Sequence, residues 1–356
     1  MLTVEEARER VLAGFKPLEA EEAPLTEALG RVLADDTLAQ EASPPFANSA
    51  MDGYALRSAD TQDASAQSPV RLRLVGEVPA GSVYAGVAQP GEAIRILTGA
   101  PLPDGADAAL QQELTEVGDG WVTIREPVAP GTNVRHIGDD VRPGMLLARA
   151  GAELGPAEIA LLASLGVSPV RVRRRPRVAI LATGDELTPL GQPLKPGQIY
   201  NSNTPYLIAA VARAGAVPVA LGIAPDRAEA LRAMLTQAQG YDLILTSGGV
   251  SVGDYDLVKQ ILSEQGAVEF WRVRVRPGKP LAFGFLGQTP LLGLPGNPVS
   301  AAVTFELFGR PAIRRMLGAA QVERPVVAVT LAGDEQRRSD RRQFVRVRLA
   351  SRAGQL

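Results

Sequence analysis

The stretch "YDLILTSGGVSVGDYDLVKQIL", residues 241–262, runs an apolar segment into Ser-Gly-Gly, then into two acids and a helical pattern. An apolar run of this length, closed by glycines, is typical of a strand buried inside a sheet. The stretch therefore predicts a strand, a glycine-rich turn and a helix, the building unit of α/β folds.

The sequence around this stretch repeats the alternation from Arg177 onward. Strands are expected at 178–183, 217–223 and 241–247, and helices at 204–215, 226–238 and 254–266. Such spacing predicts a parallel sheet covered on both faces, with ligands at the carboxyl ends of its strands. Two further strand-like runs, 269–275 and 281–286, precede a long helix expected to begin at Asn297 and Pro298.

The N-terminal part has a different sequence pattern. Thr3 and Glu6 stand at capping-box spacing, which predicts a helix over residues 3–12. A second helix is expected around Pro24–Leu33.

The middle of the N-terminal half, from Pro44 to Arg142, consists of short alternating runs such as "VRLRLVGEV", broken by Gly and Pro. This pattern predicts a small β domain. Helical periodicity returns over 155–166, so the β domain would be an insertion between helical pieces. Beyond Arg324, "VVAVTL" and "RQFVRVRLA" predict the beginning of another β module.

Composition sets outer limits on the class of protein. A chain of 356 residues is long enough for two to four domains, and 46% hydrophobic with 21% charged residues is ordinary for a folded protein. No apolar run reaches the roughly 18 residues of a membrane helix, and acids occupy the N-terminal sequence where a signal peptide would be apolar. There is no cysteine, and His136 is the single histidine, which excludes thiolate and multi-histidine metal sites within one chain. We expect a cytoplasmic protein with no membrane partner.

Charge is divided unevenly along the chain. Residues 1–175 carry 16 basic and 25 acidic side chains, whereas 176–356 carry 21 and 14. A basic half suits anionic ligands, although two differently solvated surfaces would explain it equally well. Nucleic acid is not expected as a partner, because the basic residues are scattered and aromatic residues total only 4%.

Polar residues follow three of the expected α/β strands. They are Asp185 and Glu186 in "TGDEL", Ser247, Gly248, Gly249, Ser251, Asp254 and Asp256 in "SGGVSVGDYD", and Ser300 in "PGNPVS". Gly-rich turns before helices expose backbone N–H groups that suit a phosphate or another oxyanion. Acids beside such a turn suit a hard cation such as Mg²⁺ that bridges carboxylate and phosphate oxygens.

Each of these residues also has a purely structural interpretation. Asp226 and Glu229 form a capping-box pattern, and Asp256 can cap the helix that follows it. The glycines can simply supply positive φ angles. Lys279 is one of four lysines against 33 arginines, which favours a need for a compact ammonium there, with solvent exposure as the alternative.

A set of motifs in fixed order resembles a known family. They are "PPFANSAMDGYALR" (44–57), "ILTGAPLPDGADA" (96–108), "TGDEL" (183–187), "GQIYNSN" (197–203), "SGGVSVGDYD" (247–256), "RPGKPLAFG" (276–284) and "LPGNPVSA" (294–301). Over residues 1 to about 320 the chain resembles the molybdopterin molybdenumtransferases, the family that also supplies the C-terminal domain of gephyrin. A strand-end Ser-Gly-Gly also occurs in molybdopterin adenylyltransferase, but the "MDGYA" segment and the β insertion do not.

The resemblance implies an α/β multidomain fold and a homodimer. The expected parts are a discontinuous helical domain (1–43 and 143–175), an inserted β domain (44–142), a three-layer molybdopterin-binding α/β domain with a parallel-rich sheet (176–320) and a partial C-terminal β domain (321–356). The family's last domain normally continues further than this chain.

The resemblance also implies an activity. The enzyme would insert molybdate into the dithiolene of adenylylated molybdopterin, with Mg²⁺, releasing AMP and Mo-molybdopterin. Molybdopterin adenylyltransferase would be its pathway partner, and molybdoenzymes would receive the product. The alternative is a non-catalytic molybdopterin-binding protein or a gephyrin-like scaffold.

The family's site residues can be carried over by position. Those expected to act in catalysis are Asp52, Glu186, Asp226, Asp256 and Lys279. Those expected to bind substrate are Thr98, Asp140, Ser247, Gly248, Gly249, Arg276, Pro295, Pro298, Ser300 and Arg341, with Arg342 as the alternative to Arg341. Those expected to hold Mg²⁺ are Glu186, Asp254 and Asp256. Asp52 and Thr98 would reach the site of the partner subunit.

Overall fold

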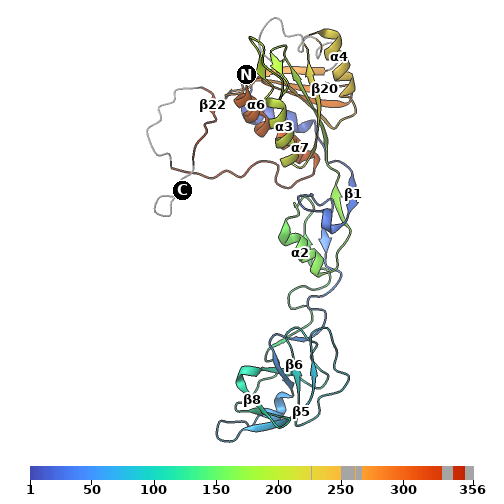
Figure 1. The fold of residues 1–356 in the computed structure, drawn as a ribbon, viewed down its shortest axis with the longest axis vertical. Coiled ribbons are helices and arrows are strands. Elements are labelled where there is room, and N and C mark those ends of the chain that lie inside the picture. Colours follow the sequence, from blue (N-terminus) through green and yellow to red (C-terminus); the bar gives the residue numbers. More distant parts are fainter. Residues whose placement is uncertain (226, 250–260, 262–266, 331–339, 349–356) are drawn as a thin grey trace. The chain divides into compact units, whose positions relative to one another are not determined.

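A computed structural model describes residues 1–225, 227–249, 261, 267–330 and 340–348 (Figure 1). The chain divides into two compact units. The first, called the α/β unit below, comprises Met1–Asp36, Ala148–Ala160 and Val167–Leu356. The second, called the β unit, comprises Thr37–Leu147 and Leu161–Gly166.

A six-stranded sheet forms the centre of the α/β unit. Its strands lie in the order β16 (Val217–Ala224), β13 (Arg177–Thr183), β17 (Leu243–Ser247), β21 (Thr289–Leu294), β20 (Pro280–Leu286) and β18 (Ala267–Arg272). The first four strands are mutually parallel, and β20 and β18 are antiparallel to their neighbours. The expected α/β fold class with a parallel-rich sheet is therefore confirmed.

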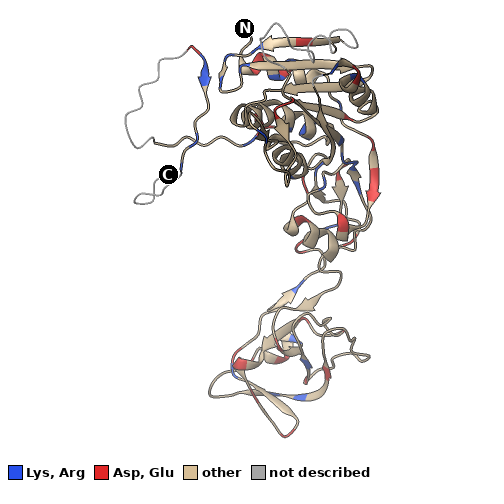
Figure 2. Ribbon diagram, turned by 45° about the horizontal axis from the view of Figure 1, so that its top comes forward, with Lys and Arg blue, Asp and Glu red and all other residues tan. Residues whose placement is uncertain are grey.

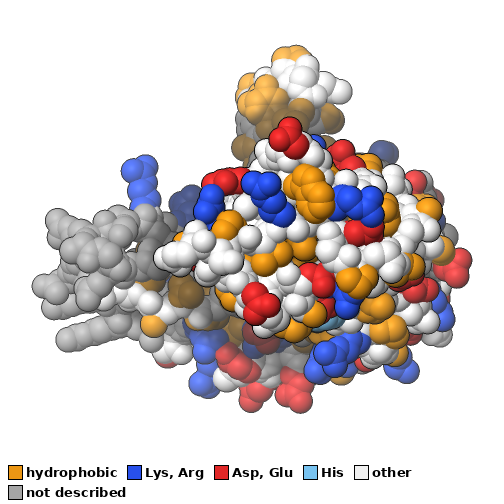
Figure 3. Space-filling view, turned by 90° about the horizontal axis from the view of Figure 1, so that it is seen from below, with side chains coloured by type: hydrophobic (Ala, Val, Ile, Leu, Met, Phe, Trp, Pro, Cys, Tyr) orange, Lys and Arg blue, Asp and Glu red, His pale blue; other side chains and the backbone are white. Residues whose placement is uncertain are grey.

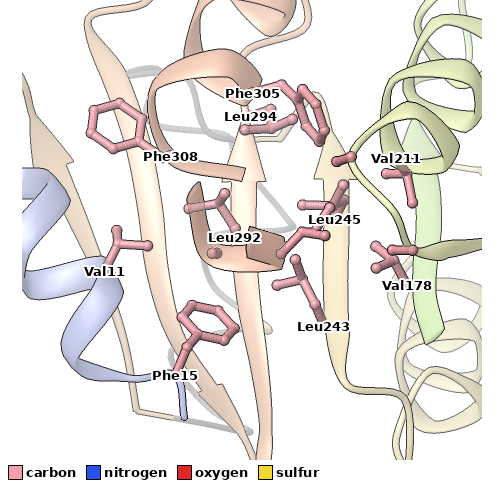
Figure 4. Close-up of a cluster of buried hydrophobic side chains, with 14 of the residues drawn as sticks. Val11, Phe15, Val178, Val211, Leu243, Leu245, Leu292, Leu294, Phe305 and Phe308 are labelled. Carbon is pink, nitrogen blue, oxygen red and sulfur yellow. The ribbon is translucent and has the colours of Figure 1, made fainter. Parts of the chain in front are cut away.

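Successive residues of the central strands enter hydrophobic cores on opposite faces of the sheet. Val178 and Ile180 of β13 belong to one core, whereas Ala179 and Leu181 belong to the other. Side chains alternate across a strand, so a run that is apolar at every position needs cover on both sides. Figure 4 shows the first of these cores, where Phe305 and Phe308 pack with the central strands.

Helices provide the cover on both faces (Figure 1). They are α1 (Val4–Ala13), α3 (Asn203–Arg213), α4 (Ala228–Gln237), α6 (Pro298–Thr304) and α7 (Arg310–Met316), with the π-helix η4 (Phe305–Gly309) joining the last two. Residues of α1, α3 and α7 enter the core of Val178, and Leu231 and Leu235 of α4 enter the other. The capping box predicted at Thr3 and Glu6 is present.

The long helix expected from Pro298 begins there but is not uniform. Asn297 caps it by accepting hydrogen bonds from the N–H groups of Val299 and Ser300. The π-helical turn η4 then interrupts the α-helical pattern. Pro311 lacks the N–H that an α-helix would donate to Leu307, and this loss favours a wider turn at that point.

The second helix expected around Pro24–Leu33 is wrong. Only a 3₁₀ turn, η1 (Leu25–Glu27), forms there. Gly30 has a φ of +70°, and its N–H donates to the Leu154 carbonyl oxygen at 2.8 Å. Leu33 forms an isolated bridge with Val172. Backbone pairing with distant segments therefore replaces the local bonds of a helix.

Short paired strands form in the residues near the boundaries of the two units. In the α/β unit, β1 (Ala20–Ala23) pairs antiparallel with β12 (Val170–Arg173). The helix α2 (Pro156–Ser164) precedes β12 and matches the expectation for residues 155–166. The strand β2 (Thr37–Leu38) pairs with β11 (Leu146–Ala148).

A second six-stranded sheet forms the β unit. Its strands lie in the order β7 (Ala108–Gln111), β4 (Gly53–Leu56), β6 (Glu92–Ile96), β5 (Val70–Val78), β9 (Trp121–Ile124) and β8 (Thr115–Gly118). Around it lie β3 (Asn48–Ser49), which pairs with β10 (Val134–Arg135), and the 3₁₀ turns η2 (Ser58–Thr61) and η3 (Gln112–Leu114). Leu56 and Ala55 again enter different cores.

The C-terminal β module is not formed as expected from the sequence. Residues 326–330 have no regular structure, so a strand over "VVAVTL" is wrong for its described part. The strand β22 (Arg342–Gln343) is much shorter than expected and pairs in parallel with β19 (Val275–Arg276). An alternating sequence forms a strand only where another strand pairs with it, and no described residue pairs with 326–330.

Charged residues are distributed over the ribbon of both units rather than gathered in one block (Figure 2). The face drawn in Figure 3 intersperses apolar, basic and acidic side chains. Among the described residues, no helix combines the length and apolar character needed to cross a membrane.

Candidate functional site

Four loops of the α/β unit meet at one edge of its sheet. Strands β13, β17 and β21 are parallel, so the loops that follow Thr183, Ser247 and Leu294 leave at the same edge. Strand β20 is antiparallel to β21, so its first residue, Pro280, also lies at this edge. Lys279 directly precedes that strand and therefore joins the three carboxyl-end loops.

The Ser-Gly-Gly turn after β17 packs closely against the neighbouring strand ends. Gly248 has a φ of +96° and Gly249 a φ of +67°. A Cβ on Gly248 would lie 2.8 Å from the Thr183 carbonyl oxygen. The Gly248 N–H donates to the Leu294 carbonyl oxygen at 3.1 Å. The structural interpretation of both glycines is therefore confirmed, and the same geometry leaves bare backbone at the edge of the sheet.

A buried asparagine connects two of these loops. The Nδ2 of Asn203, at the start of α3, donates to Ser247 Oγ and to the Gly296 carbonyl oxygen, both at 2.7 Å. Asn203 is 9% exposed and Ser247 is 3% exposed. The bridge fixes the ends of β17 and β21 against the first turn of α3.

The loop before Lys279 lies against the helix that carries Ser300. A Cβ on Gly278, whose φ is +100°, would lie 2.7 Å from Thr304 Cγ2 and 3.5 Å from the Ser300 carbonyl oxygen. The Ser300 hydroxyl is 3.4 Å from Asn297 Oδ1. Pro298 occupies the first position of α6, and Pro295 follows the last residue of β21. These contacts bring Lys279, Ser300 and the turn at Pro295 into one region.

The segment leading to Arg276 is held on both sides by backbone bonds. The Arg274 N–H donates to the Leu2 carbonyl oxygen at 2.8 Å, and the Arg274 carbonyl oxygen accepts from the Arg342 N–H at 3.0 Å. The Arg276 carbonyl oxygen accepts from the Phe344 N–H at 2.9 Å. The exposed Arg276 is thereby held three residues before Lys279.

The two candidate arginines of the C-terminal segment differ in their partners. Arg342 forms an ion pair with Glu5 of α1. Arg341 lies 3.8 Å from Asp340, measured from Nε to Oδ1. Pairing places Gln343 opposite Arg276, while Arg342 lies opposite the fully buried Val275. Both arginines therefore have partners, and the choice between them as a contact of molybdate stays a prediction.

Glu186 is the acidic candidate that the structure places at this edge. It follows β13 in a turn that ends in β14 (Leu187–Thr188), which pairs with β15 (Ile199–Tyr200). Its carboxylate lies directly over Gly184, where a Cβ would come within 2.7 Å of Oε1. Glu186 is exposed and offers oxygen ligands of the kind that Mg²⁺ prefers. The part of the chain that the structure describes contains no cluster of three or more potential metal ligands.

Three acidic candidates, Asp226, Asp254 and Asp256, lie outside the described residues. So does most of the helix expected over 254–266. Their roles stay predictions.

Asp52 and Thr98 lie in the β unit, where they contact each other. Asp52 Oδ1 accepts from the Thr98 hydroxyl at 2.6 Å and from the Thr98 N–H at 2.7 Å. These two hydrogen bonds, that of the hydroxyl first, lower the pKa of Asp52 below its usual range. Asp52 is therefore a fixed, exposed carboxylate at neutral pH.

Asp140, also in the β unit, forms an ion pair with Arg135. Its N–H donates to the Ser43 carbonyl oxygen at 2.9 Å. Both side chains of the pair are about half exposed.

The structure thus groups the sequence-derived candidates into two sets. Ser247, Gly248, Gly249, Arg276, Lys279, Pro295, Pro298, Ser300 and Glu186 lie at the carboxyl edge of the α/β sheet, and Asp52, Thr98 and Asp140 lie in the β unit. Sequence reasoning missed Asn203. Its signals were its place at the end of the motif "GQIYNSN" and its position just before the expected helix, where an asparagine is ordinarily interpreted as a cap.

Two family models match the chain. Residues 2–166 match the "MoeA N-terminal region (domain I and II)", and residues 179–315 match a "Probable molybdopterin binding domain".

Curated relatives are similar over most of the chain. It is 43% identical to "Molybdopterin molybdenumtransferase 2" of Mycobacterium tuberculosis over 93% of this chain and 84% of that protein. It is 40% identical to the "Molybdopterin molybdenumtransferase" of Haemophilus influenzae over 91% of this chain and 80% of that protein. A crystal structure titled as the molybdopterin biosynthesis MoeA protein of Pyrococcus horikoshii aligns with a TM-score of 0.79, at 39% identity, over 89% of this chain and 80% of that one.

Proposed function

The chain belongs to the molybdopterin molybdenumtransferase family, and from this we propose that it transfers molybdenum to adenylylated molybdopterin, releasing AMP in a Mg²⁺-dependent reaction. Its relatives' names make it a transferase of molybdenum cofactor biosynthesis that acts on molybdopterin. We propose three further details of the reaction: the substrate is adenylylated, AMP is released, and the metal is Mg²⁺. The relatives' names favour an enzyme over the scaffold alternative.

The observation that carries the proposal is the meeting of four loops at the carboxyl edge of the sheet. Bare backbone at Gly248 and Gly249 lies beside a turn that bears Ser300 and a loop that bears Lys279. Molybdate is a dianion and the proposed substrate carries a pyrophosphate, so both need N–H donors and cations. We assign Arg276, Lys279, Ser300 and Arg341 to molybdate, and the Ser247 turn to phosphate.

The proposal requires no protein nucleophile. The two thiol sulfurs that receive molybdenum come with the substrate and displace one oxygen of molybdate, which leaves as water with the thiol protons. One water molecule cleaves the phosphoanhydride bond, leaving one phosphate on molybdopterin and the other on AMP, so the absence of cysteine is compatible with the reaction. The protein binds both anions and holds them in contact, which removes much of the entropic cost of their encounter. Lys279 also neutralises charge as the anions approach.

Magnesium fits the donor chemistry of this edge. Glu186 supplies carboxylate oxygens there, and we propose Asp254 and Asp256 as the further ligands, because the described residues alone contain no three-ligand cluster. Bound Mg²⁺ would neutralise the pyrophosphate and stabilise departing AMP as a Lewis acid.

The residues of the β unit enter the proposal as part of a homodimer. Asp52, held by Thr98, and Asp140 are assigned to the site of the partner subunit. The pathway supplying the substrate is proposed to end in molybdopterin adenylyltransferase, with molybdoenzymes taking the product in the cytoplasm. Asp226 is kept as a further acidic residue of the site.

The test is incubation of the purified protein with adenylylated molybdopterin, MgCl₂ and molybdate, following AMP by chromatography. AMP release should depend on molybdate and should stop when EDTA removes Mg²⁺. Asp256→Ala and Lys279→Ala should abolish it, whereas Lys16→Ala, at an exposed lysine outside the four loops, should leave it unchanged. Release without molybdate, or wild-type rates in both site variants, would reject the proposal.

A further inference from the structure

Asn203 makes contacts that a helix cap does not need. Its Nδ2 reaches Ser247 Oγ and the Gly296 carbonyl oxygen, both at 2.7 Å, across 44 and 93 residues of sequence. With 9% of its surface exposed, it is held inside the protein. The asparagine therefore acts between loops rather than within its own turn.

The Gly296 carbonyl decides which way the asparagine amide points. A carbonyl oxygen only accepts hydrogen bonds, so the atom that faces it must be the NH₂ group. The carbonyl therefore determines which way the side-chain amide of Asn203 is turned. Two hydroxyl neighbours would not, because a hydroxyl can both donate and accept. The same NH₂ group faces Ser247 Oγ, so the serine oxygen is an acceptor in this bond.

The hydroxyl hydrogen of Ser247 is consequently directed away from Asn203. Within the part of the chain that the structure describes, no acceptor receives it. A buried hydroxyl donor is costly to leave without an acceptor, so an acceptor that arrives with a ligand would be favoured at this position. Gly248 and Gly249, which follow the serine directly, have positive φ and carry no side chain.

We propose that Asn203 is a positioning residue that turns Ser247 into a hydrogen-bond donor for an anionic phosphate oxygen of the substrate. A phosphate oxygen at neutral pH accepts and does not donate, so a serine with its hydrogen turned inward would repel it. This inference rests on the proposed function, because it names the residue that prepares the phosphate loop.

Asn201 provides a matched control two residues away. It is 7% exposed, and among the described residues its side chain bonds Thr204 alone, from Nδ2 to Oγ1 at 2.9 Å and from the Thr204 N–H to Oδ1 at 3.2 Å. Both bonds are local to the first turn of α3. Asn201→Ala should lower the melting temperature without altering the loops at Ser247 and Gly296.

The experiment measures AMP binding by titration calorimetry alongside the KM for adenylylated molybdopterin. Asn203→Ala and Ser247→Ala should each raise the Kd of AMP and the KM roughly tenfold, the effect of one lost bond to a charged group. The double variant should be no worse than Ser247→Ala alone, because Asn203 acts through the serine. Asn201→Ala should leave both constants unchanged.

Asn203→Asp keeps the shape of the side chain and replaces its donor with an acceptor. It should weaken AMP binding more than Asn203→Ala, since its carboxylate would accept the Ser247 hydrogen and repel the Gly296 carbonyl. It also serves as the test if Asn203→Ala does not fold.

Three results would overturn the inference: no AMP binding by the wild type, additive effects of the two substitutions, or an equal loss in Asn201→Ala. Loss of AMP binding in Asn203→Ala with no molybdate-dependent turnover in the wild type would keep the inference and reject only the proposed function.

Discussion

Arg174 donates two hydrogen bonds to Asp242, from its terminal nitrogens at 2.8 and 2.9 Å. Asp242 also accepts from the Arg177 N–H at 2.7 Å, so one carboxylate joins the approach to β13 with the start of β17. Arg174 in addition pairs with Glu19, beside β1. These bonds tie the residues that precede β13 to the start of β17.

Asp242→Asn should lower the stability of the α/β unit by about 1–2 kcal/mol, less than for a fully buried pair because solvent screens the exposed part of Arg174. The measurement is the urea midpoint at pH 7. Glu306→Gln, which breaks a more exposed pair with Arg324, is the control and should change the midpoint less. Equal effects of the two substitutions would contradict a special role for Asp242.

The effect of Asp242 should depend on pH. Burial opposes its ionisation, but the bonds from Arg174 and from the Arg177 N–H outweigh it and lower the pKa of Asp242. A carboxyl with a lowered folded pKa stabilises above its unfolded pKa, about 4, and loses this contribution as pH falls through the folded value. The difference between wild type and Asp242→Asn should therefore be constant above about pH 5 and shrink on further acidification. If the stability difference between wild type and Asp242→Asn increased in acid, the predicted direction of the pKa shift would be wrong.

Thr98→Val should raise the pKa of Asp52 toward its ordinary value, since it removes the hydroxyl donor and keeps the backbone donor. Titration of the ¹³C carboxyl signal of Asp52 measures this directly. Thr132→Val is the control in the same unit, because the Thr132 hydroxyl donates to the Ala129 carbonyl oxygen and, among the described residues, to no carboxylate. An unchanged Asp52 titration in Thr98→Val would show that the hydroxyl bond does not form in solution.

Gly248→Ala should cost about 2 kcal/mol or more, because its φ is +96° and its Cβ would collide with the Thr183 carbonyl. AMP release should fall as the loop shifts. Gly191→Ala is the matched control, since its φ is +83° but nothing lies within 4 Å of its Cβ position. Thermal unfolding and turnover are measured for both variants, because Gly191→Ala shows the effect of backbone strain alone. Equal losses of stability and turnover in the two variants would show that the contact with Thr183 contributes nothing.

Arg341→Ala should raise the molybdate concentration needed for half-maximal AMP release, because it removes the guanidinium assigned to molybdate, whereas Arg342→Ala should change it less. Both arginines have an acidic partner, Asp340 for Arg341 and Glu5 for Arg342, so the comparison tests the assignment itself. Glu5→Gln removes the acidic partner of Arg342 and should change the required molybdate concentration as little as Arg342→Ala does. A stronger effect of Arg342→Ala than of Arg341→Ala would reverse the assignment.

The sheet could be predicted because its strands carry a strong local signal. The runs at 178–183, 217–223 and 241–247 are apolar, and β13, β16 and β17 form there within two residues of the expected bounds. Their common direction follows from the helices between them. The meeting of the loops at one edge follows in turn.

The segments at Pro24–Leu33 and 326–330 could not be predicted, because tertiary pairing decides them. Leu33 pairs with Val172, and 326–330 pairs with no described residue, yet both sequences have regular patterns. Lys279 and Ser300 could be named as candidates from their motifs. The bond network of Asn203 could not, because its partners are 44 and 93 residues away and no local pattern encodes them.

The paired strands β2 and β11 mark where the β unit leaves and rejoins the rest of the chain. Close to them, the Ala39 N–H donates to the Met145 carbonyl oxygen and the Gly144 N–H to the Ala39 carbonyl oxygen, at 2.9 and 2.8 Å. An inserted domain whose first and last strands are paired leaves the two flanking ends of the chain next to each other. Such a domain can therefore change in length, or be replaced, without a change in the path of the flanking chain.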